Sequence, residues 1–264
     1  VSRAFIDGEY GQVHYRTAGR RSHKPTIVCL HMVPKSSRSF AKLMPLLAKD
    51  RLVIAPDYPG YGDSQAPPSQ PHITIQDYGR VIRQMLCDLK CGPVCIVGYH
   101  TGSMVAVEIA DSWSEEVLQL VNISAPIFTD EETAALHDYF SPVPLDIKGQ
   151  RFITMWSRIL EHRGPGMTLE MAAQSMCDNM MGGENYEWGH RAAFNYTGIY
   201  AQKLTGLNQP ILVLNIQDDL YNHTLRVDKL LKNGIRKNNL NWGHGFLEIC
   251  ADQAAKETLD FFDQ

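Results

Sequence analysis

The chain has 264 residues, of which 44% are hydrophobic and 20% charged, and its formal net charge is -4. This composition is ordinary for a globular protein and long enough for one large α/β domain with an insertion, or for two small domains. The absence of a basic stripe argues against nucleic acid as a partner. No apolar run approaches the roughly 20 residues that cross a bilayer, so we expect no membrane partner either.

The cysteine pattern predicts free thiols in a reducing compartment. Tight Cys-x-x-Cys pairs, which zinc sites normally show, do not occur. The first five residues also lack the apolar stretch of a signal peptide. We therefore expect a cytoplasmic protein with six unpaired cysteines: Cys29, Cys87, Cys91, Cys95, Cys177 and Cys250.

The first half of the chain alternates strands with helices. Two short segments around Asp7-Gly8 predict a hairpin, and Thr74 with Asp77 resembles a capping box at the start of a helix. Short, fully apolar runs are typical of strands buried on both faces. We expect strands at 26–30, 52–56, 94–97 and 118–123, and helices at 39–48, 73–89 and 101–113. This rhythm predicts a mainly parallel sheet with helices on both faces.

The rhythm breaks after the 118–123 strand. Helical patterns follow at 130–139, 151–162, 169–180 and 186–204, with no convincing strand among them. Strand character returns at 211–215 and 236–241, with helices at 226–232 and 252–262. The sequence therefore predicts an α/β core formed by 1–126 and 209–264, interrupted by a helical cap at 127–208.

One segment between a buried strand and a helix carries the main chemical signal. It reads Val97-Gly98-Tyr99-His100-Thr101-Gly102. Glycines two residues before and after a central residue allow a sharp strand-to-helix turn, in which that residue adopts a positive φ. Histidine tolerates positive φ better than most residues, so His100 can occupy the tip.

Four further segments agree in order and spacing with one family. They are His31-Met32-Val33-Pro34 after the 26–30 strand, the turn from Asp57 to Ser64, Asn215-Ile216-Gln217-Asp218-Asp219, and Gly243-His244-Gly245 before the last helix. Together with the Gly98–Gly102 segment they resemble the capped α/β-hydrolases, in particular the epoxide hydrolase, haloperoxidase and carbon–carbon hydrolase group. The resemblance spans essentially the whole chain and implies an eight-stranded, mainly parallel sheet.

The resemblance also implies roles for individual residues. Position 100 would be the nucleophile site, where relatives carry serine, cysteine or aspartate, with Asp218 as the orienting acid and His244 as the base. Asp219 and Asp130 are the alternative acids. The oxyanion hole would be formed by the Val33 and Thr101 amides, with Met32 standing where relatives have glycine. We expect a substrate pocket lined by His31, Met32, Tyr99 and Trp156, although His31 could instead brace the loop.

A histidine at this position changes the chemistry. A serine hydroxyl needs a base to remove its proton, whereas a neutral imidazole already has a nucleophilic nitrogen. With a reference pKa of about 6.5, much of the imidazole is neutral at pH 7. His100 could therefore attack a carbonyl directly, or act as a general base on water while His244 handles a second proton.

These observations favour a cofactor-free hydrolase of a small organic substrate, cleaving an ester, a lactone or a carbon–carbon bond next to a carbonyl. A lyase, isomerase or cofactor-free oxygenase on the same scaffold remains open, and so does a non-catalytic receptor. A metal site formed by His100, His244 and Asp218 is a further alternative, although relatives are metal-free. A homodimer is compatible with the sequence.

Overall fold

One sheet organises the chain in the computed structural model, which describes residues 1–68 and 73–264. Within these residues the sheet has eight strands in the order β1-β2-β4-β3-β5-β6-β7-β8. Their bounds are β1 (Ser2–Gly8), β2 (Gly11–Ala18), β3 (Thr26–Leu30), β4 (Val53–Pro56), β5 (Val94–Tyr99), β6 (Val117–Ile123), β7 (Ile211–Ile216) and β8 (Gly234–Asn239). This is the eight-stranded sheet that the sequence predicts.

The strand directions follow the predicted pattern. The β1–β2 hairpin is antiparallel, and β2 also runs antiparallel to β4. Every other neighbouring pair in the sheet is parallel. The parallel strands from β4 to β8 therefore end at the same edge, and the loops that follow them meet there.

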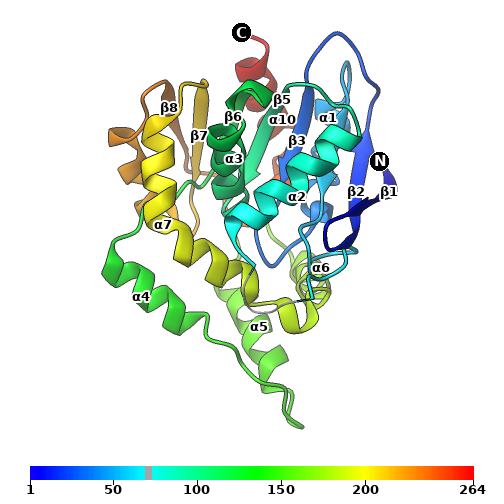
Figure 1. Cartoon of the computed structure of the whole chain (residues 1–264). Helices are drawn as coiled ribbons and strands as arrows, with labels where there is room; N and C mark the ends of the chain where they lie inside the picture. Colours follow the sequence, from blue (N-terminus) through cyan, green and yellow to red (C-terminus); the bar gives the residue numbers. More distant parts are fainter. Residues whose placement is uncertain (69–72) are drawn as a thin grey trace.

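Helices cover both faces of the sheet (Figure 1). One layer contains α2 (Ile75–Asp88), α3 (Thr101–Ser112) and part of α7 (Trp188–Gly206), and the other contains α1 (Met44–Leu47) and α10 (Ala251–Phe262). The capping box predicted at Thr74 and Asp77 is confirmed at the start of α2. Shorter elements near the loops are η1 (Ser37–Phe40), η2 (Ser114–Glu116), α8 (Tyr221–Thr224), η4 (Leu225–Lys229) and α9 (Phe246–Ile249).

The central strands are buried on both faces, as their unbroken apolar sequences predict. Alternate residues of one strand contribute to different cores because successive side chains point to opposite faces. In β3, Val28 and Leu30 pack in the core beneath α2, α3 and α7, whereas Ile27 and Cys29 pack in the core beneath α1 and α10. Two hydrophobic cores therefore hold the sheet rigidly between the helical layers.

Two helix predictions are only partly correct. Instead of one helix over 39–48, the chain forms η1 and then the short α1. Pro45 explains the break, because a continuous helix would need the backbone N–H that proline lacks. The helix predicted over 226–232 is replaced by α8 and η4, which end at Lys229.

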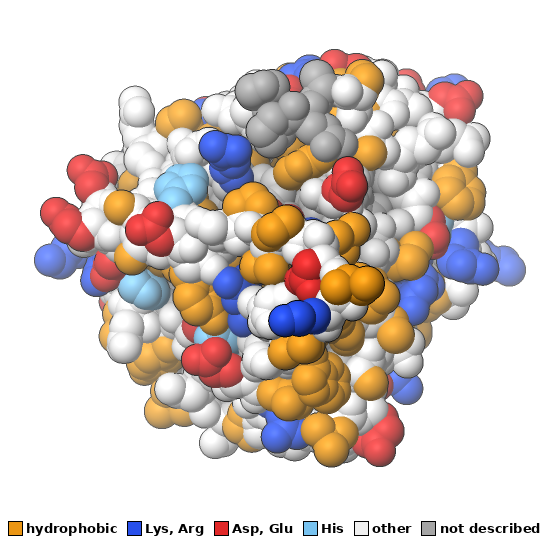
Figure 2. All heavy atoms as spheres, turned by 90° about the horizontal axis from the view of Figure 1, so that it is seen from below, with side chains coloured by type: hydrophobic (Ala, Val, Ile, Leu, Met, Phe, Trp, Pro, Cys, Tyr) orange, Lys and Arg blue, Asp and Glu red, His pale blue; other side chains and the backbone are white. Residues whose placement is uncertain are grey.

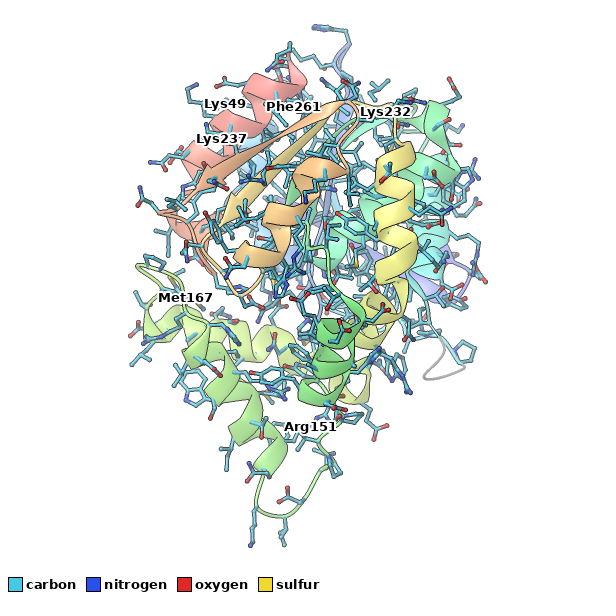
Figure 3. The ribbon with its side chains drawn as sticks, turned by 90° about the vertical axis from the view of Figure 1, so that its left-hand side faces the viewer. Lys49, Arg151, Met167, Lys232, Lys237 and Phe261 are labelled. Carbon is cyan, nitrogen blue, oxygen red and sulfur yellow. The ribbon has the colours of Figure 1, made fainter. Side chains whose placement is uncertain are left out.

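A run of helices separates β6 from β7. It contains α4 (Asp130–Tyr139), α5 (Gln150–Glu161), α6 (Leu169–Met180), η3 (Gly183–Asn185) and α7. Figure 3 shows this run below the sheet, with Arg151 and Met167 labelled in it, while Lys232, Lys237 and Phe261 lie toward the other end of the molecule. The second half of α7 buries Tyr196, Tyr200 and Leu204 in the core of the sheet domain. The segment 127–208, which the sequence predicts as a cap, thus includes the second half of α7, and this half packs against the sheet as a flanking helix.

Two chemical expectations can be compared with the fold. All six cysteine thiols are free, as predicted, and Cys87 and Cys177 are exposed. In the described part of the chain, no helix is both long enough and apolar enough to span a membrane.

Candidate functional site

His100 lies at the tip of the turn between β5 and α3, with φ 50° and ψ -113°. This positive φ confirms the expectation from the two glycines. A Cβ on Gly98 would lie 2.4 Å from the Gly102 carbonyl oxygen, and a Cβ on Gly102 would lie 2.0 Å from the Leu30 carbonyl oxygen. Only glycine lets the helix approach the strands this closely, so the two glycines hold His100 at the carboxyl edge of the sheet.

The imidazole of His100 is paired with Asp218. Their Nε2 and Oδ2 atoms are 2.8 Å apart, and the Asp218 side chain is completely buried. The same Asp218 oxygen accepts a hydrogen bond from the Ser124 hydroxyl at 2.7 Å, while its other oxygen accepts one from the Leu220 amide at 2.9 Å. These contacts hold the Asp218 carboxylate in one orientation, and this carboxylate in turn orients the His100 ring.

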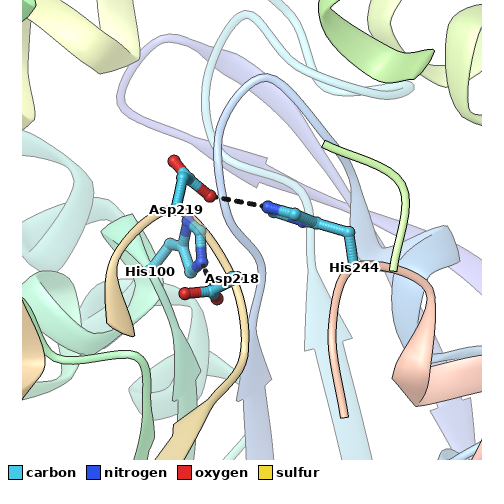
Figure 4. A group of neighbouring side chains, drawn as sticks. All are labelled: His100, Asp218, Asp219 and His244. Carbon is cyan, nitrogen blue, oxygen red and sulfur yellow. Dashed lines mark hydrogen bonds and ion pairs between the residues drawn. The ribbon is translucent and has the colours of Figure 1, made fainter. Parts of the chain in front are cut away.

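His244 is paired with Asp219 instead (Figure 4). The His244 Nε2 and Asp219 Oδ1 atoms are 2.7 Å apart, and the other ring nitrogen lies 3.3 Å from the Tyr99 hydroxyl. Burial favours the neutral imidazole, but the hydrogen bond and charge of Asp219 outweigh it and raise the pKa of His244. Burial likewise opposes ionisation of Asp219, yet the hydrogen bond from His244 lowers the pKa of this carboxyl.

The predicted acid assignment is therefore wrong in its pairing. We expected Asp218 to orient His244, but Asp218 contacts His100 and the adjacent Asp219 contacts His244. The cause is the tight turn after β7, where the Asp218 amide donates to the Ile216 carbonyl and the two successive carboxylates point in different directions. Asp130, the other alternative, is exposed at the start of α4.

The two imidazoles face each other across the site. Their ring centroids are 5.4 Å apart and their planes are inclined at 68°. Two histidine–aspartate pairs therefore stand side by side, where the sequence predicts a single relay through position 100, His244 and Asp218. The expectation that His244 is partly charged agrees with its raised pKa, although its partner is Asp219.

The loop after β3 supplies a second part of the site. Val33 lines the same cavity as His100 and Thr101. Neither the Val33 nor the Thr101 amide donates a hydrogen bond to any other residue within 1–68 and 73–264. Unpaired amides facing a cavity can stabilise a developing oxyanion. Both amides predicted as oxyanion-hole donors are thus free to bind a ligand atom. Their role as an oxyanion hole stays a prediction.

The position of this loop is set by contacts with the rest of the fold. His31 is fully buried, and its Nε2 accepts a hydrogen bond from the Tyr58 amide at 3.1 Å while Nδ1 donates to the Met32 carbonyl at 2.9 Å. On the other side, Asp178 of α6 accepts hydrogen bonds from the Ser36 amide and hydroxyl, at 3.1 and 2.6 Å. The helical segment between β6 and β7 therefore contributes directly to the position of the predicted oxyanion loop.

A cavity of about 150 Å³ opens over the two imidazoles. Cavities of this size hold a molecule such as benzene. Its walls come from the strand-end loops and from α4, α5, α6 and α7. They include, besides His100, Thr101, Asp219 and His244, the side chains of Met32, Val33, Lys35, Met104, Phe128, Leu136, Tyr139, Phe140, Arg158, Ile159, His162, Met167, Tyr186, His190 and Phe194.

Of the four predicted pocket residues, only Met32 lines this cavity. His31 braces the loop from inside the core and has no exposed surface. Tyr99 is buried against His244 and lines a neighbouring pocket instead. Trp156 is only partly buried and does not line this cavity, because the face of α5 that carries Ile159 turns toward it instead.

Sequence reasoning missed several wall residues with polar side chains. Arg158 and His190 lie in α5 and α7, His162 directly follows α5, and Lys35 directly follows the predicted oxyanion loop. Burial lowers the pKa of His190 to about 3, so this imidazole is neutral, and it lowers that of Lys35 to about 8. Only the position of Lys35 beside a known motif could have indicated its location beforehand.

A second, wider hollow of about 1200 Å³ lies among the same helices. It shares Phe140 and Phe194 with the cavity over the imidazoles, but neither histidine–aspartate pair lines it. Figure 2 views this side of the molecule, where apolar side chains gather between charged ones. Leu145 and Ile147 are exposed at this end, at 64% and 103%. His100, Asp219 and His244 thus line the smaller of these two cavities.

The four paired side chains also satisfy the basic requirement of a metal site. One donor atom from each of His100, Asp218, Asp219 and His244 lies within 4.8 Å of all the others. Two imidazoles and two carboxylates suit transition metals such as zinc, iron or manganese. In the present geometry, however, two of the ring nitrogens and two of the carboxylate oxygens already form hydrogen bonds with one another.

Comparison with known proteins supports the fold and covers part of the site. A sequence model of the family described as alpha/beta hydrolase fold matches residues 25–153, which include His100 but not the segments of Asp219 and His244. Proline iminopeptidase of Lactobacillus acidophilus is 29% identical over 119 residues, 44% of this chain and 41% of that protein. Epoxide hydrolase 4 of Mus musculus is 30% identical over 120 residues, 44% of this chain and 33% of that protein. The matches thus span less than half of these two relatives.

Solved structures agree with the fold over the full length. An esterase from Exiguobacterium antarcticum has a TM-score of 0.82 at 14% identity, covering 98% of this chain and 99% of its own. An enol-lactonase from Burkholderia xenovorans has a TM-score of 0.76 at 18% identity, covering 99% and 100%. A bromoperoxidase from Bacillus anthracis has a TM-score of 0.81 at 15% identity and covers both chains completely. These structures show that the chain has the α/β-hydrolase fold.

Proposed function

We propose that the protein is a cofactor-free hydrolase of a small organic substrate, cleaving an ester, a lactone or a carbon–carbon bond next to a carbonyl. The observation that carries this proposal is the His100–Asp218 pair at the nucleophile position, in a cavity that also presents the free Val33 and Thr101 amides. A base or nucleophile and two oxyanion donors are the minimum equipment for acyl transfer.

The tautomer of His100 follows from its partner. An ionised carboxylate only accepts hydrogen bonds, so the Nε2 atom that faces Asp218 carries the proton. In the neutral ring the lone pair is then on Nδ1, which makes no hydrogen bond to the described residues. In this tautomer His100 can act as a base with an orienting carboxylate, the arrangement that a catalytic triad normally supplies through its histidine.

In the proposed reaction, His100 Nδ1 takes a proton from a water molecule as the oxygen attacks the substrate carbonyl. The Val33 and Thr101 amides donate to the oxyanion that forms. The intermediate then collapses, and the leaving group receives the proton from His100 while Asp218 keeps the ring oriented. Direct attack by Nδ1 would instead give a short-lived acyl-imidazole, and trapping experiments distinguish the two routes.

His244 takes a different role from the one implied by the family resemblance. Both of its ring nitrogens have partners, Asp219 and the Tyr99 hydroxyl, so no lone pair is left for proton abstraction. Its raised pKa favours the charged form. We propose that His244 stabilises negative charge in the transition state rather than activating a nucleophile.

The choice of bond type draws on related proteins. Structural neighbours include the esterase from Exiguobacterium antarcticum and the enol-lactonase from Burkholderia xenovorans, which supports esters and lactones as the first substrates to test. We also propose that the helices in 127–208 act as the cap of this cavity, because α4, α5, α6 and the first half of α7 supply much of its wall.

One observation favours a second candidate. The nucleophile position lacks a hydroxyl, thiol or carboxylate, and two imidazoles stand 5.4 Å apart. Such a pair could move a proton between two atoms of one substrate, which is the chemistry of an isomerase or lyase. In that case the substrate would be converted without incorporation of water oxygen.

The test is a panel of activated esters and lactones with wild type, His100→Ala and the control His23→Ala, which removes an exposed histidine far from the site in sequence. We expect turnover by wild type and by the control, and loss of turnover in His100→Ala. Reaction in ¹⁸O-labelled water should place the label in the acid product. Equal turnover by His100→Ala would contradict the proposal, and conversion without label would favour the isomerase or lyase.

A further inference from the structure

The cavity contains an arginine whose charge has no partner. Arg158, on α5, lines the cavity together with His100 and His244 and is partly buried. Its guanidinium donates to the Tyr139 carbonyl oxygen and lies near the Tyr139 and Tyr186 hydroxyls, all of which are neutral. No carboxylate in the described ranges forms an ion pair with it. Arginine cannot lose its proton in a protein, so this charge persists in the cavity.

Two other arginines near these helices are paired with carboxylates. Arg151, about two turns earlier on the same helix, forms an ion pair with Glu187 at 2.8 Å. Arg226 is paired with Glu132. An unpaired charge away from bulk water is unfavourable, and protein side chains of this kind are normally compensated. Arg158 has no such pair among the described residues, although it lines the same cavity as His100 and His244.

Aromatic side chains hold this guanidinium in place. Its central carbon is 4.4 Å from the centroid of the Tyr139 ring and 5.2 Å from that of Phe140. Cation–π contacts of this kind orient a guanidinium while leaving its edge N–H groups available to a ligand. The arrangement is preorganised, so binding would cost little further side-chain entropy.

The balance of charge in the cavity favours an anion. Lys35 also lines it and donates only to neutral acceptors on Ser175 and Asn179. Among the described lining residues the one acid is Asp219, whose carboxylate is hydrogen-bonded to His244. The cavity wall is therefore positively charged, in contrast to the net charge of -4 of the whole chain.

From these observations we propose that Arg158 binds a carboxylate on the substrate, so that the natural substrate is a small organic acid that also carries the hydrolysable ester or lactone group. A planar carboxylate matches the two parallel N–H donors of a guanidinium. The apolar wall from Phe128, Phe140 and Phe194 would hold the body of the molecule, and the volume suits a body about the size of one ring. This inference rests on the proposed hydrolase function for the reacting group, but the carboxylate site can be measured without turnover.

The binding test compares benzoate with benzamide, its neutral counterpart of the same shape, by calorimetry. Wild type should bind benzoate at least about tenfold more tightly than benzamide, because charge-assisted hydrogen bonds are stronger than neutral ones. Arg158→Gln should lose this preference, and Arg158→Lys should keep part of it. The control Arg163→Gln removes an exposed arginine near the end of the same helix and should bind both ligands as wild type does.

Thermal unfolding of each variant establishes that it is folded before binding is measured. His100→Ala should still bind benzoate, which separates this inference from the catalytic proposal. If His100→Ala binds benzoate but wild type hydrolyses nothing, the catalytic proposal fails and the carboxylate site stands. Equal benzoate binding by wild type and Arg158→Gln would overturn the inference. So would the failure of wild type to bind any of benzoate, phenylacetate and succinate at millimolar concentration.

Discussion

Asp218 orients His100, the residue at the nucleophile position, and not His244. The family resemblance would assign the Asp218 carboxylate to the base, His244, but in this structure it contacts His100 instead. Since Asp219 takes its place beside His244, the turn after β7 supports two imidazoles at once. The predictions that follow from this arrangement differ from those of an ordinary triad.

The first prediction concerns a serine at position 100. In His100→Ser the hydroxyl would need a base, but Asp219 and the Tyr99 hydroxyl occupy both nitrogens of His244. We therefore expect no gain of esterase activity and no covalent labelling by a fluorophosphonate probe, although the glycine frame suits a serine. Labelling is measured by intact-protein mass spectrometry, with a known serine hydrolase as positive control. Rapid labelling would mean that His244 can release Asp219 and act as a base.

The second prediction concerns the orienting carboxylate. Asp218→Asn keeps the shape of the side chain but removes the charge that supports a positive His100 during proton transfer. Loss of such support should lower kcat by about 10²–10⁴, with a smaller change in KM. Steady-state kinetics on the best ester of the panel gives both values. If only KM changed in Asp218→Asn and kcat stayed at the wild-type value, His100 would not be the residue that carries the proton.

The third prediction is the pH behaviour of the second pair. Because the pKa of His244 is raised, its charged form contributes stability fully below the ordinary histidine value of 6.5, and this contribution is lost as the pH rises through the raised value. Because the pKa of Asp219 is lowered, its contribution is present above the ordinary value of 3.8 and is lost as the pH falls through the lowered one. Both contributions are fully present between the two ordinary values, pH 3.8 and pH 6.5. In this range the free energy of unfolding of wild type should exceed that of Asp219→Asn by the largest amount.

NMR titration of the His244 ring checks the cause. In Asp219→Asn the pKa of His244 should fall, since burial still favours the neutral ring while the compensating charge is gone. Denaturant unfolding at pH 5 and pH 9 measures the stability difference, which should shrink at pH 9. An unchanged His244 titration in the variant would contradict the assignment of Asp219 as its partner.

The fold could be predicted from the sequence because its signals are local. Unbroken apolar runs mark the strands of the sheet, and Gly98 with Gly102 marks the turn that carries His100. The pairing of the acids could not be predicted in the same way. Asp218 and Asp219 are adjacent, so motif order assigns either of them to the base, and only the turn after Ile216 decides which imidazole each one meets.

The cavity wall was the least predictable part. Trp156 and Arg158 lie two residues apart on α5, and which of them faces the cavity depends on how the helix is rotated against the sheet domain. No motif fixes that rotation, because it results from packing between elements distant in sequence. The same holds for His190 on α7.

The fourth prediction tests the glycine frame. In Gly98→Ala the new methyl group would lie 2.4 Å from the Gly102 carbonyl oxygen, so backbone must shift. Overpacking of this kind should lower the free energy of unfolding by about 1–3 kcal/mol and displace His100. Gly198→Ala is the matched control, because nothing lies within 4 Å of its added methyl group in α7, and alanine there should stabilise the helix by about 0.5–1 kcal/mol. Denaturant unfolding should give opposite signs for the two substitutions.

The last prediction concerns metal ions. The proposed reaction uses the hydrogen bonds between each imidazole and its carboxylate, and a metal held by the same atoms would have to displace both of them. We therefore expect dialysis against EDTA to leave kcat and the thermal unfolding temperature unchanged, and added zinc to inhibit by competing for His100 and His244. Elemental analysis of the purified protein gives the metal content directly. Loss of activity with EDTA, restored by zinc and abolished in Asp219→Asn, would instead make these four side chains a metal centre and remove the free Nδ1 base from the mechanism.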